Sequence, residues 1–490
     1  MSRYILAVDQ STQGTKGLLF DENGVLAARA DRPHRQIVND KGWVEHDPVE
    51  ILQNTIGVCA DVLAKSGVSS SRIAAFAISN QRETSMMWDK ATGRPIYNAI
   101  VWQCARAVEI CERPEIAEKA ETVRARTGIN LSPYFPAAKL NWLMENVPEA
   151  KNLAAQGRLA CGTVDSWLIW NLTGRHWTDY SNASRTQLFN IVDLKWDREL
   201  CELFSVPVES LPEVHMSDDN FGETYLNGVL DHKVPIHGVL GDSHGALFGQ
   251  DCRTPGKVKA TYGTGSSVMM HIGDKPKFSG NGLVTSLAWG INGKVEYVFE
   301  GNLNYTGAVM TWLKENVRLI STDMEATELA YAANPNDQAY FVPAFTGLGA
   351  PYWDSHATGM LTGITRTTGR KEIAKACLEC IAYQITDLVR LMARDSGLPV
   401  SALRVDGGPT ASKYLMQFQA DMADAQVRVP ALQELSGMGA AYAAGIALGI
   451  YVPDRIYNSI QYRDYLPQMD PSRRETLYRG WQEAIFKVRR

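Results

Sequence analysis

Residues 5–20 read ILAVDQSTQGTKGLLF, a polar turn with one glycine between two apolar runs of strand length. A second turn signal, Asp21–Gly24, follows directly, and Val25–Ala28 continues as another apolar run. Short apolar runs separated by such turns are typical of hairpin-linked strands. The start of the chain therefore predicts a strand, a polar loop and two further strands.

The same order of features recurs near the middle of the chain. Residues 257–272 read KVKATYGTGSSVMMHI, with the small polar turn Gly263–Ser266 between two apolar runs. Two hairpin-linked strands are expected next, at Leu283–Trp289 and Val295–Phe299. Similar patterns about half a chain apart indicate an internal repeat.

Further apolar runs alternate with helical patterns and so extend each half into an α/β unit. Strands are expected at Ile73–Ser79, Ile236–Leu240 and Leu403–Val405, and Asp47-Pro48 is typical of a helix start. We therefore predict two α/β domains, residues 1–248 and 249–490, that face each other across a cleft.

Composition narrows the class of protein. The chain has 490 residues, of which 45% are hydrophobic and 21% charged, with a net charge of −5. This balance predicts no partner among nucleic acids or anionic membranes. The first residues lack an apolar signal region, and the run Met438–Val452 is too short to span a bilayer. We expect a cytoplasmic protein with a small-molecule substrate; a homo-oligomer is left open.

Cysteine usage favours a reducing compartment. There are 8 cysteines, and Cys377 and Cys380 form a Cys-x-x-Cys that metal or redox sites also use. They lie inside Glu372–Arg394, where apolar residues recur at helical spacing. Because a free cysteine packs like a small apolar side chain, we interpret both as buried helix residues.

Three turns have the composition of phosphate-binding loops. Asp9–Lys16, Gly263–Ser266 and Asp406–Pro409 each follow an expected strand and carry glycine or small hydroxyl residues. Such loops let backbone N–H groups approach phosphate, and a carboxylate such as Asp9 could hold Mg²⁺. Each alone could equally be a plain turn. None matches a Walker A loop or a dinucleotide-binding fingerprint.

Two longer segments give the chain a specific resemblance. One is residues 134–146, YFPAAKLNWLMEN, and the other runs from Gly359–Ile364 to Ala376–Glu379. On these, the chain resembles the FGGY family of carbohydrate kinases over nearly all its length. Within that family, stretches such as residues 42–48 (GWVEHDP), 80–84 (NQRET) and 343–354 (PAFTGLGAPYWD) are similar to glycerol kinases.

The resemblance implies a fold, an activity and a set of site residues. The fold would be a pair of duplicated, actin-like (ribonuclease-H-like) ATPase domains. The activity would be ATP-dependent, with Mg²⁺, and would phosphorylate a terminal hydroxyl of glycerol or a similar short polyol. The first domain would carry the polyol site, the phosphate loop and the catalytic base, and the second would bind ATP. The implied residues are Asp242 as catalytic base; Arg82, Glu83, Trp102, Tyr134, Asp242, Ser243 and Ser267 at the polyol; Thr12, Gln13, Gly14, Lys16, Thr264, Gly307, Thr311, Gly408 and Ser412 at ATP; and Asp9 and Asp242 at the metal.

The chemistry of these residue types fits phosphoryl transfer, which depends on positioning and charge stabilisation. Asp242 is expected where a strand opens into a helix, so it could accept a hydroxyl proton or simply cap that helix. The pair Arg82-Glu83 could bind adjacent hydroxyls or form an ordinary surface ion pair. Trp102 and Tyr134 could cover the carbon face of the substrate or pack in the core.

Some positions depart from the glycerol kinase pattern. Ser243 stands where glutamine is typical and Ser267 where an aromatic residue is typical, so both put a smaller side chain near the expected substrate. Thr311 and Ser412 stand where glutamine and asparagine are common. An alternative is therefore a kinase for a four- or five-carbon polyol or ketose, of the erythritol, threitol or xylulose type. A third hypothesis is a non-catalytic nucleotide sensor built on the same fold.

Overall fold

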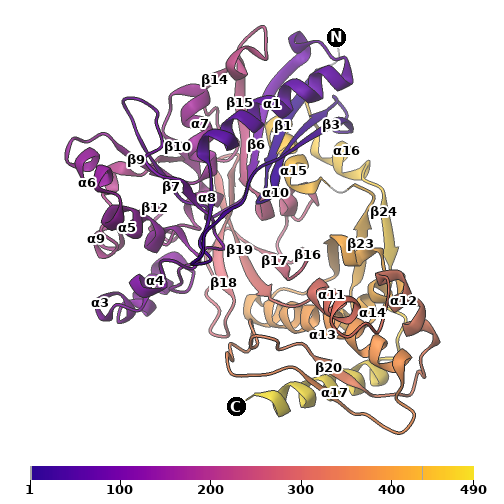
Figure 1. The fold of residues 1–490 in the computed structure, drawn as a ribbon. Coiled ribbons are helices and arrows are strands. Elements are labelled where there is room, and N and C mark those ends of the chain that lie inside the picture. The colour runs from indigo at the N-terminus through magenta and orange to yellow at the C-terminus, as the bar shows by residue number, and fades with distance from the viewer. Residues whose placement is uncertain (1–2, 433, 490) are drawn as a thin grey trace.

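A computed structural model describes residues 3–432 and 434–489, which form two mixed β-sheets covered by helices (Figure 1). The first is a six-stranded sheet of order β14-β15-β6-β1-β2-β3. Its strands are β1 (Tyr4–Gln10), β2 (Gly14–Phe20), β3 (Leu26–Pro33), β6 (Ile73–Asn80), β14 (Glu223–Thr224) and β15 (Val234–Gly241).

The second is a seven-stranded sheet of order β18-β19-β17-β16-β22-β23-β24. Its strands are β16 (Val258–Tyr262), β17 (Ser266–Gly273), β18 (Val284–Ile291), β19 (Lys294–Leu303), β22 (Ala402–Asp406), β23 (Gln426–Pro430) and β24 (Tyr462–Tyr465).

The two sheets repeat one pairing scheme. In the first, β1 pairs antiparallel with β2 and parallel with β6, which in turn pairs parallel with β15. In the second, β16 pairs antiparallel with β17 and parallel with β22, which pairs parallel with β23. Each series ends in a short antiparallel edge strand, β14 or β24. The repeat expected from the two polar turns is therefore confirmed at the level of topology.

Several local predictions are also confirmed. Helix α1 (Pro48–Ser66) begins after Asp47, whose side chain accepts a hydrogen bond from the Val49 backbone N–H. Helix α13 (Arg370–Ser396) contains both Cys377 and Cys380, which are buried and unpaired. Among the described residues, no helix has both the length and the apolar character needed to cross a bilayer.

Two helices pack between the sheets. Helix α10 (Asp242–Gly249) follows β15, and α15 (Leu435–Ala447) lies against α10 and against β1, β6 and β15. The helices approach closely because glycines line their contact: a Cβ on Gly439 would lie 1.8 Å from the carbonyl oxygen of Gly245. The Tyr442 hydroxyl also donates to the carbonyl of Gly24 across 3.0 Å.

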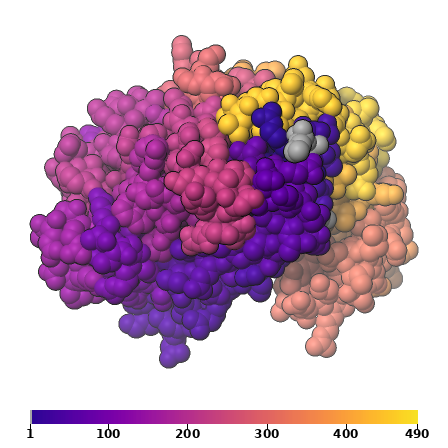
Figure 2. Space-filling view, turned by 90° about the horizontal axis from the view of Figure 1, so that it is seen from above, coloured from indigo at the N-terminus to yellow at the C-terminus, as the bar shows by residue number. Residues whose placement is uncertain are grey.

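Segments from the end of the chain thus cover the first sheet. In Figure 2 the yellow C-terminal segment lies against indigo residues from the start of the chain. The core around α10 and α15 joins residues of both sheets, including Ala7 and Leu240 of the first and Met269 and Val298 of the second. The division of the chain at residues 248 and 249 remains a prediction.

Candidate active site

The predicted site residues follow the carboxyl ends of the parallel strands of the first sheet. We call this end of the sheet, where the strands finish together, the carboxyl edge, or simply the edge. Gln10, Asn80 and Gly241 are register neighbours at the ends of β1, β6 and β15. The residues that follow them, Ser11–Gln13, Gln81–Glu83 and Asp242, therefore share that edge. Ligands of open α/β sheets bind at such an edge, where several strands end together.

Arg82 lies at the centre of this edge and is buried. Its Nε is 3.3 Å from Oδ1 of Asp242. Its Nη1 and Nη2 donate to the two carboxylate oxygens of Glu300, on β19 of the second sheet, at 3.1 and 3.0 Å. Burial by itself would lower the pKa of Arg82, but Glu300, Glu83 and Asp242 hold it well above its ordinary value. The guanidinium is therefore charged and held in one orientation, because fork-to-fork pairing fixes its plane.

A second buried arginine completes a charge cluster. Arg185 donates from Nε to Oε1 of Glu83 at 2.6 Å, and its Nη1 forms an ion pair with Glu300 at 2.9 Å. Arg82, Glu83, Arg185 and Glu300 are all buried. Burial would raise the pKa of Glu300, yet the two arginines hold it far below its usual range. Two arginines and two carboxylates thus neutralise one another where the halves of the molecule meet.

Glu300 and Arg185 were not predicted from the sequence. Glu300 follows Val298 and Phe299, so a charged residue inside an apolar strand was the available signal. β19 runs four residues beyond the strand end expected at Phe299, and this extension carries Glu300. An isolated buried charge is strongly unfavourable, so Glu300 needs a partner of opposite charge. The sequence pattern does not show which residue that partner is.

Asp242 is the first residue of α10 and does not act as its cap. The capping position is Gly241, and the Asp242 carboxylate accepts a hydrogen bond from the Ser243 backbone N–H at 2.6 Å. The side chain is 36% exposed, so a ligand can reach it. A helix N-terminus favours a negative charge at this place. The next residue but one, His244, is buried, and burial together with Arg82 lowers its pKa well below the ordinary value, so it is neutral.

Two predicted aromatic residues flank the same edge. The rings of Trp102 and Tyr134 lie with their centroids 5.4 Å apart. Trp102 donates from Nε1 to Oγ1 of Thr12 at 2.9 Å, which ties the aromatic pair to the β1–β2 turn. Both side chains are only partly buried, so they are not ordinary core residues.

Lys139 holds the backbone at Tyr134 in place. This lysine is buried in α5 (Pro136–Asn146), and its ammonium donates to the carbonyls of Pro133, at 2.7 Å, and Tyr134. Burial lowers the pKa of Lys139 to about 7, against an opposing effect of Glu83. Lys139 therefore has a local role that its sequence position did not reveal.

Strands β1 and β2 and the turn between them carry Asp9, predicted for the metal, and Lys16 and Thr12–Gly14, predicted for phosphate. Burial raises the pKa of Asp9 to about 6; Lys16 lowers it and the nearby Asp242 raises it further. Lys16 lies 3.6 Å from Asp9 and 2.8 Å from Glu434. Within the described residues no cluster of three or more metal-ligating side chains occurs. Two carboxylates suffice for Mg²⁺, which usually keeps waters and takes phosphate oxygens as its other ligands.

A pocket of about 330 Å³ lies beside the equivalent turn of the second sheet. Its walls come from the β16–β17 turn, α11 (Gly307–Glu315), α12 (Asp323–Ala332), Leu378 of α13 and the segment after β22 that ends at Ser412. A Cβ on Gly307 would lie 2.5 Å from the carbonyl oxygen of Gly263, so only glycine allows α11 to start against this turn. The pocket is lined by all five residues predicted for ATP in this half, namely Thr264, Gly307, Thr311, Gly408 and Ser412.

The predicted residues thus fall into two groups. One gathers where the parallel strands of the first sheet end: Asp9, Arg82, Glu83, Trp102, Tyr134 and Asp242 with the Thr12–Gly14 turn. The other is the pocket on the second sheet. Ser267, on β17, lies beside the first group and not in the pocket, because its Oγ is 3.4 Å from Oε1 of Glu300, which binds Arg82.

Comparison with known proteins identifies this arrangement. The N-terminal domain of the FGGY family of carbohydrate kinases matches residues 4–249, and the C-terminal domain of the same family matches residues 258–448. The chain belongs to the FGGY family of carbohydrate kinases. It is therefore a phosphotransferase with the two-domain, actin-like fold of that family, and the family and fold predicted from the sequence are confirmed.

Individual FGGY kinases are similar to the whole chain. Glycerol kinase 2 of Thermotoga maritima is 46% identical over 491 residues, covering 99% of this chain and 98% of the relative. The glycerol kinase of Carboxydothermus hydrogenoformans is 45% identical, with 99% and 98% coverage. Among solved structures, Plasmodium falciparum glycerol kinase with ADP has a TM-score of 0.93 and 33% identity, covering 99% of this chain and 98% of that one.

Proposed function

We propose that this FGGY kinase transfers the γ-phosphoryl group of ATP to a terminal hydroxyl of glycerol, giving glycerol 3-phosphate and ADP. Full-length similarity to glycerol kinases supports this substrate. The observation that supports a catalytic role for the first-sheet edge is the contact between Asp242 and the buried, oriented Arg82.

Asp242 would act as the general base. A partly exposed carboxylate beside a fixed guanidinium can accept a proton from a hydroxyl that lies within hydrogen-bond distance. Arg82 and Glu83 would bind the neighbouring hydroxyls, and Trp102 and Tyr134 would cover the carbon chain. A site of this kind discriminates well, because a substrate that lacks a hydroxyl leaves buried polar groups unpaired.

Glu300 and Arg185 would position Arg82 and Glu83 without touching the substrate. Glu300 binds Arg82, and Arg185 binds both Glu83 and Glu300. The orientation of the polyol site therefore depends on Glu300, a residue of the second sheet. This arrangement would make substrate affinity sensitive to how the two halves sit together.

ATP would place its nucleoside in the pocket lined by Thr264, Gly307, Thr311, Gly408 and Ser412, with its phosphates directed toward the Thr12–Gly14 turn. Mg²⁺, bound by Asp9 and Asp242, would offset the phosphate charge and orient the transferred group. Lys16 is held by Glu434 and Asp9, and would contribute positive charge to this region.

The alternative substrate is a four- or five-carbon polyol or ketose, as the small side chains of Ser243 and Ser267 would allow. An ADP-release assay at fixed ATP and Mg²⁺ separates the two. The panel is glycerol, dihydroxyacetone, erythritol, threitol, xylitol and xylulose, compared by kcat/KM. Glycerol should lead; a leading four- or five-carbon compound would replace glycerol as the substrate, and no turnover on the whole panel would contradict the proposal.

A further inference from the structure

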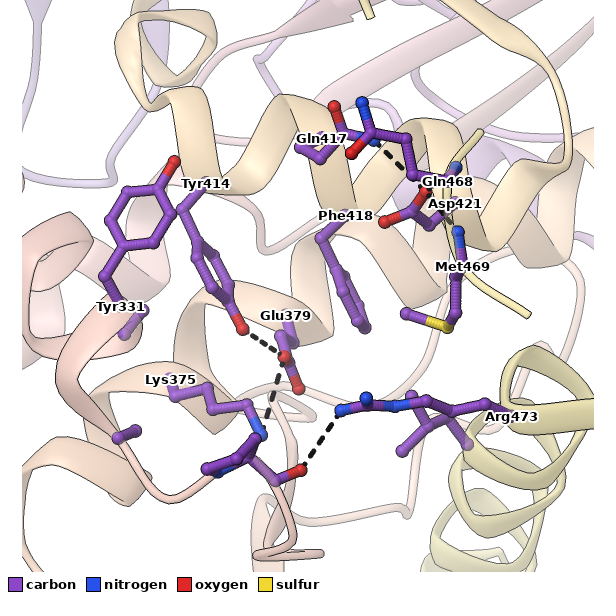
Figure 3. A pocket seen from close by; sticks show the side chains of 14 residues that line it. Tyr331, Lys375, Glu379, Tyr414, Gln417, Phe418, Asp421, Gln468, Met469 and Arg473 are labelled. Atoms are coloured by element: carbon purple, nitrogen blue, oxygen red, sulfur yellow. Dashed lines mark hydrogen bonds and ion pairs between the residues drawn. The ribbon is translucent and has the colours of Figure 1, made fainter. Parts of the chain in front are cut away.

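A second pocket, of about 360 Å³, lies among α12, α13, α14 (Lys413–Ala423) and α17 (Pro471–Val488) (Figure 3). It shares no lining residue with the proposed nucleotide pocket. No residue predicted for substrate, ATP or metal lines it. The kinase reaction therefore leaves this pocket without a role.

One wall of the pocket is aromatic. The rings of Tyr331 and Tyr414 meet edge to face with centroids 5.1 Å apart, and Phe418 is nearly parallel to Tyr414 at 6.3 Å. Met469 and Leu477 add apolar surface from the C-terminal segment. Aromatic and apolar walls of this kind suit a flat, hydrophobic ligand body.

At the other end of the pocket the two carboxylates already have partners, which leaves Arg473 as the cation that a ligand could bind. The Glu379 carboxylate accepts from the Tyr414 hydroxyl at 2.6 Å and lies 3.8 Å from the Lys375 ammonium. Asp421 accepts from the backbone N–H groups of Gln468 and Met469 at 2.6 and 3.1 Å. Both carboxylates are thus already engaged.

Arg473 is the cation of this pocket that no carboxylate of the described residues contacts directly. Among the residues that the structure describes, its guanidinium donates one hydrogen bond, to the Pro335 carbonyl at 3.2 Å, and forms no ion pair; its charge acts on Glu379 only at longer range. In Figure 3 its guanidinium reaches from α17 toward the side of the pocket that Lys375 and Glu379 line. A guanidinium has five N–H donors, so most remain available to a carboxylate.

We propose that this pocket is a regulatory site for a small aromatic carboxylate, whose ring lies along Tyr331 and Tyr414 and whose carboxylate binds Arg473. The regulatory part of this inference rests on the proposed nucleotide pocket, because α12 and α13 line both sites and Ser412, directly before α14, lines the nucleotide pocket. In each of these places, residues close together in sequence line different pockets. Thr327, Leu378 and Ser412 line the nucleotide pocket. Tyr331, Glu379 and Tyr414 line the second pocket.

A hydrogen bond beside the nucleotide pocket joins two of these elements. Oγ1 of Thr327 and Oγ of Ser412 lie 2.7 Å apart, joining α12 to the start of α14. A ligand that shifts either helix must move this contact, and with it the nucleotide pocket. Coupling of this kind is reciprocal: if the carboxylate changes the affinity for ADP by some factor, ADP changes the affinity for the carboxylate by the same factor.

Calorimetric titration of the full chain tests both parts without requiring turnover. 2-Naphthoate is the probe, the uncharged 2-naphthamide is its matched ligand, and titrations are run with and without saturating ADP. Wild-type protein should bind 2-naphthoate in the presence of ADP and bind the amide at least about tenfold more weakly, since a charge-assisted hydrogen bond is lost. Arg473→Gln should weaken 2-naphthoate by a similar factor, and Tyr331→Ala should weaken both ligands. Arg479→Gln, on the same helix and exposed, should change nothing.

Three outcomes would overturn the proposal. Absence of 2-naphthoate binding, or equal binding by wild type and Arg473→Gln, would remove the site. Full displacement by ADP would place the probe in the nucleotide pocket instead. Binding with identical affinity at zero and saturating ADP would refute the regulatory role. None of these outcomes depends on which polyol the enzyme phosphorylates.

Discussion

The guanidinium of Arg82 is bound at both ends of its fork by the carboxylate of Glu300, with donor–acceptor distances of 3.1 and 3.0 Å. Arg82 follows β6 of the first sheet and Glu300 lies on β19 of the second. A residue proposed to bind substrate is therefore oriented by the opposite half of the molecule. Breaking a buried pair of this kind leaves an uncompensated charge and destabilises a protein by about 3–5 kcal/mol.

Glu300→Gln should impair the kinase chiefly through substrate binding. The amide keeps the shape but loses the charge, so Arg82 and Arg185 lose their shared partner. We expect KM for glycerol to rise by about tenfold or more, a loss of at least about 1.4 kcal/mol, while the affinity for ADP changes little. Glu296→Gln, on the same strand but bound to Trp289, is the matched control. If KM for glycerol is unchanged in the folded Glu300→Gln enzyme, Glu300 does not position the polyol site.

Restoring larger side chains near the substrate should narrow the specificity. Ser267 lies beside Glu300, and Ser243 follows Asp242. The double variant Ser243→Gln, Ser267→Phe should lower kcat/KM for erythritol relative to glycerol by about tenfold, since a filled pocket excludes extra carbons. Steady-state rates on both substrates give the ratio, and Ser321→Gln on an exposed loop serves as control. A ratio that stays constant would mean that these serines do not limit substrate length.

Asp9→Asn should raise the thermal stability of the protein while it lowers the activity. Because the pKa of Asp9 is raised from 3.8 to about 6, its ionised form opposes folding above pH 6, and this penalty fades as pH falls toward 3.8. Two units of pKa correspond to about 3 kcal/mol. The variant should therefore melt higher than wild type at pH 7.5, keep about half of that advantage near pH 5, and lose it only as the pH approaches 3.8.

The same variant should lose Mg²⁺-dependent turnover, because an amide is a poor Mg²⁺ ligand. In wild type the apparent KM for Mg²⁺ should rise as the pH falls through about 6, where Asp9 takes up a proton. Thermal unfolding and Mg²⁺ titrations of activity measure the two effects. An Asp9→Asn enzyme with normal Mg²⁺ dependence would exclude Asp9 as a metal ligand.

Lys139→Met should loosen the aromatic side of the site. The lysine donates to the carbonyls of Pro133 and Tyr134, and these would lose a donor. We expect a stability loss of about 1–3 kcal/mol and a higher KM for glycerol at nearly constant kcat. Lys151→Met, at an exposed position in the next helix, is the control. An unchanged KM would show that Tyr134 needs no such support.

Local patterns were enough to predict the repeated strands and the residues at their ends. Alternating apolar runs and polar turns mark β1, β2, β16 and β17, and the end of a parallel strand places the following residue at the shared edge. The strand limits were less accurate: β3 runs to Pro33 and β19 to Leu303, both beyond the apolar part of the strand. The sequence pattern weakens there because charged residues such as Arg32 and Glu300 find partners only in the folded chain.

Contacts between distant segments could not be predicted from one sequence. Lys16 was expected to face phosphate, and the structure shows it also bound to Glu434, more than four hundred residues away. The use of α15 to cover the first sheet likewise depends on glycines such as Gly439, whose close contact with Gly245 has no signature in either segment alone. Similarly, the resemblance to a family indicated Arg82 and Asp242, but not the buried partners that orient them.

The most direct test of the account is turnover by Asp242→Asn with glycerol and MgATP, measured as ADP release and paired with ADP affinity by titration. Asparagine keeps the size of the side chain but cannot accept the hydroxyl proton. The account predicts that turnover falls by about 10²–10⁴ while ADP binds with wild-type affinity. Turnover within about tenfold of wild type, a difference of roughly 1.4 kcal/mol in the barrier, would contradict the role of Asp242 as the general base.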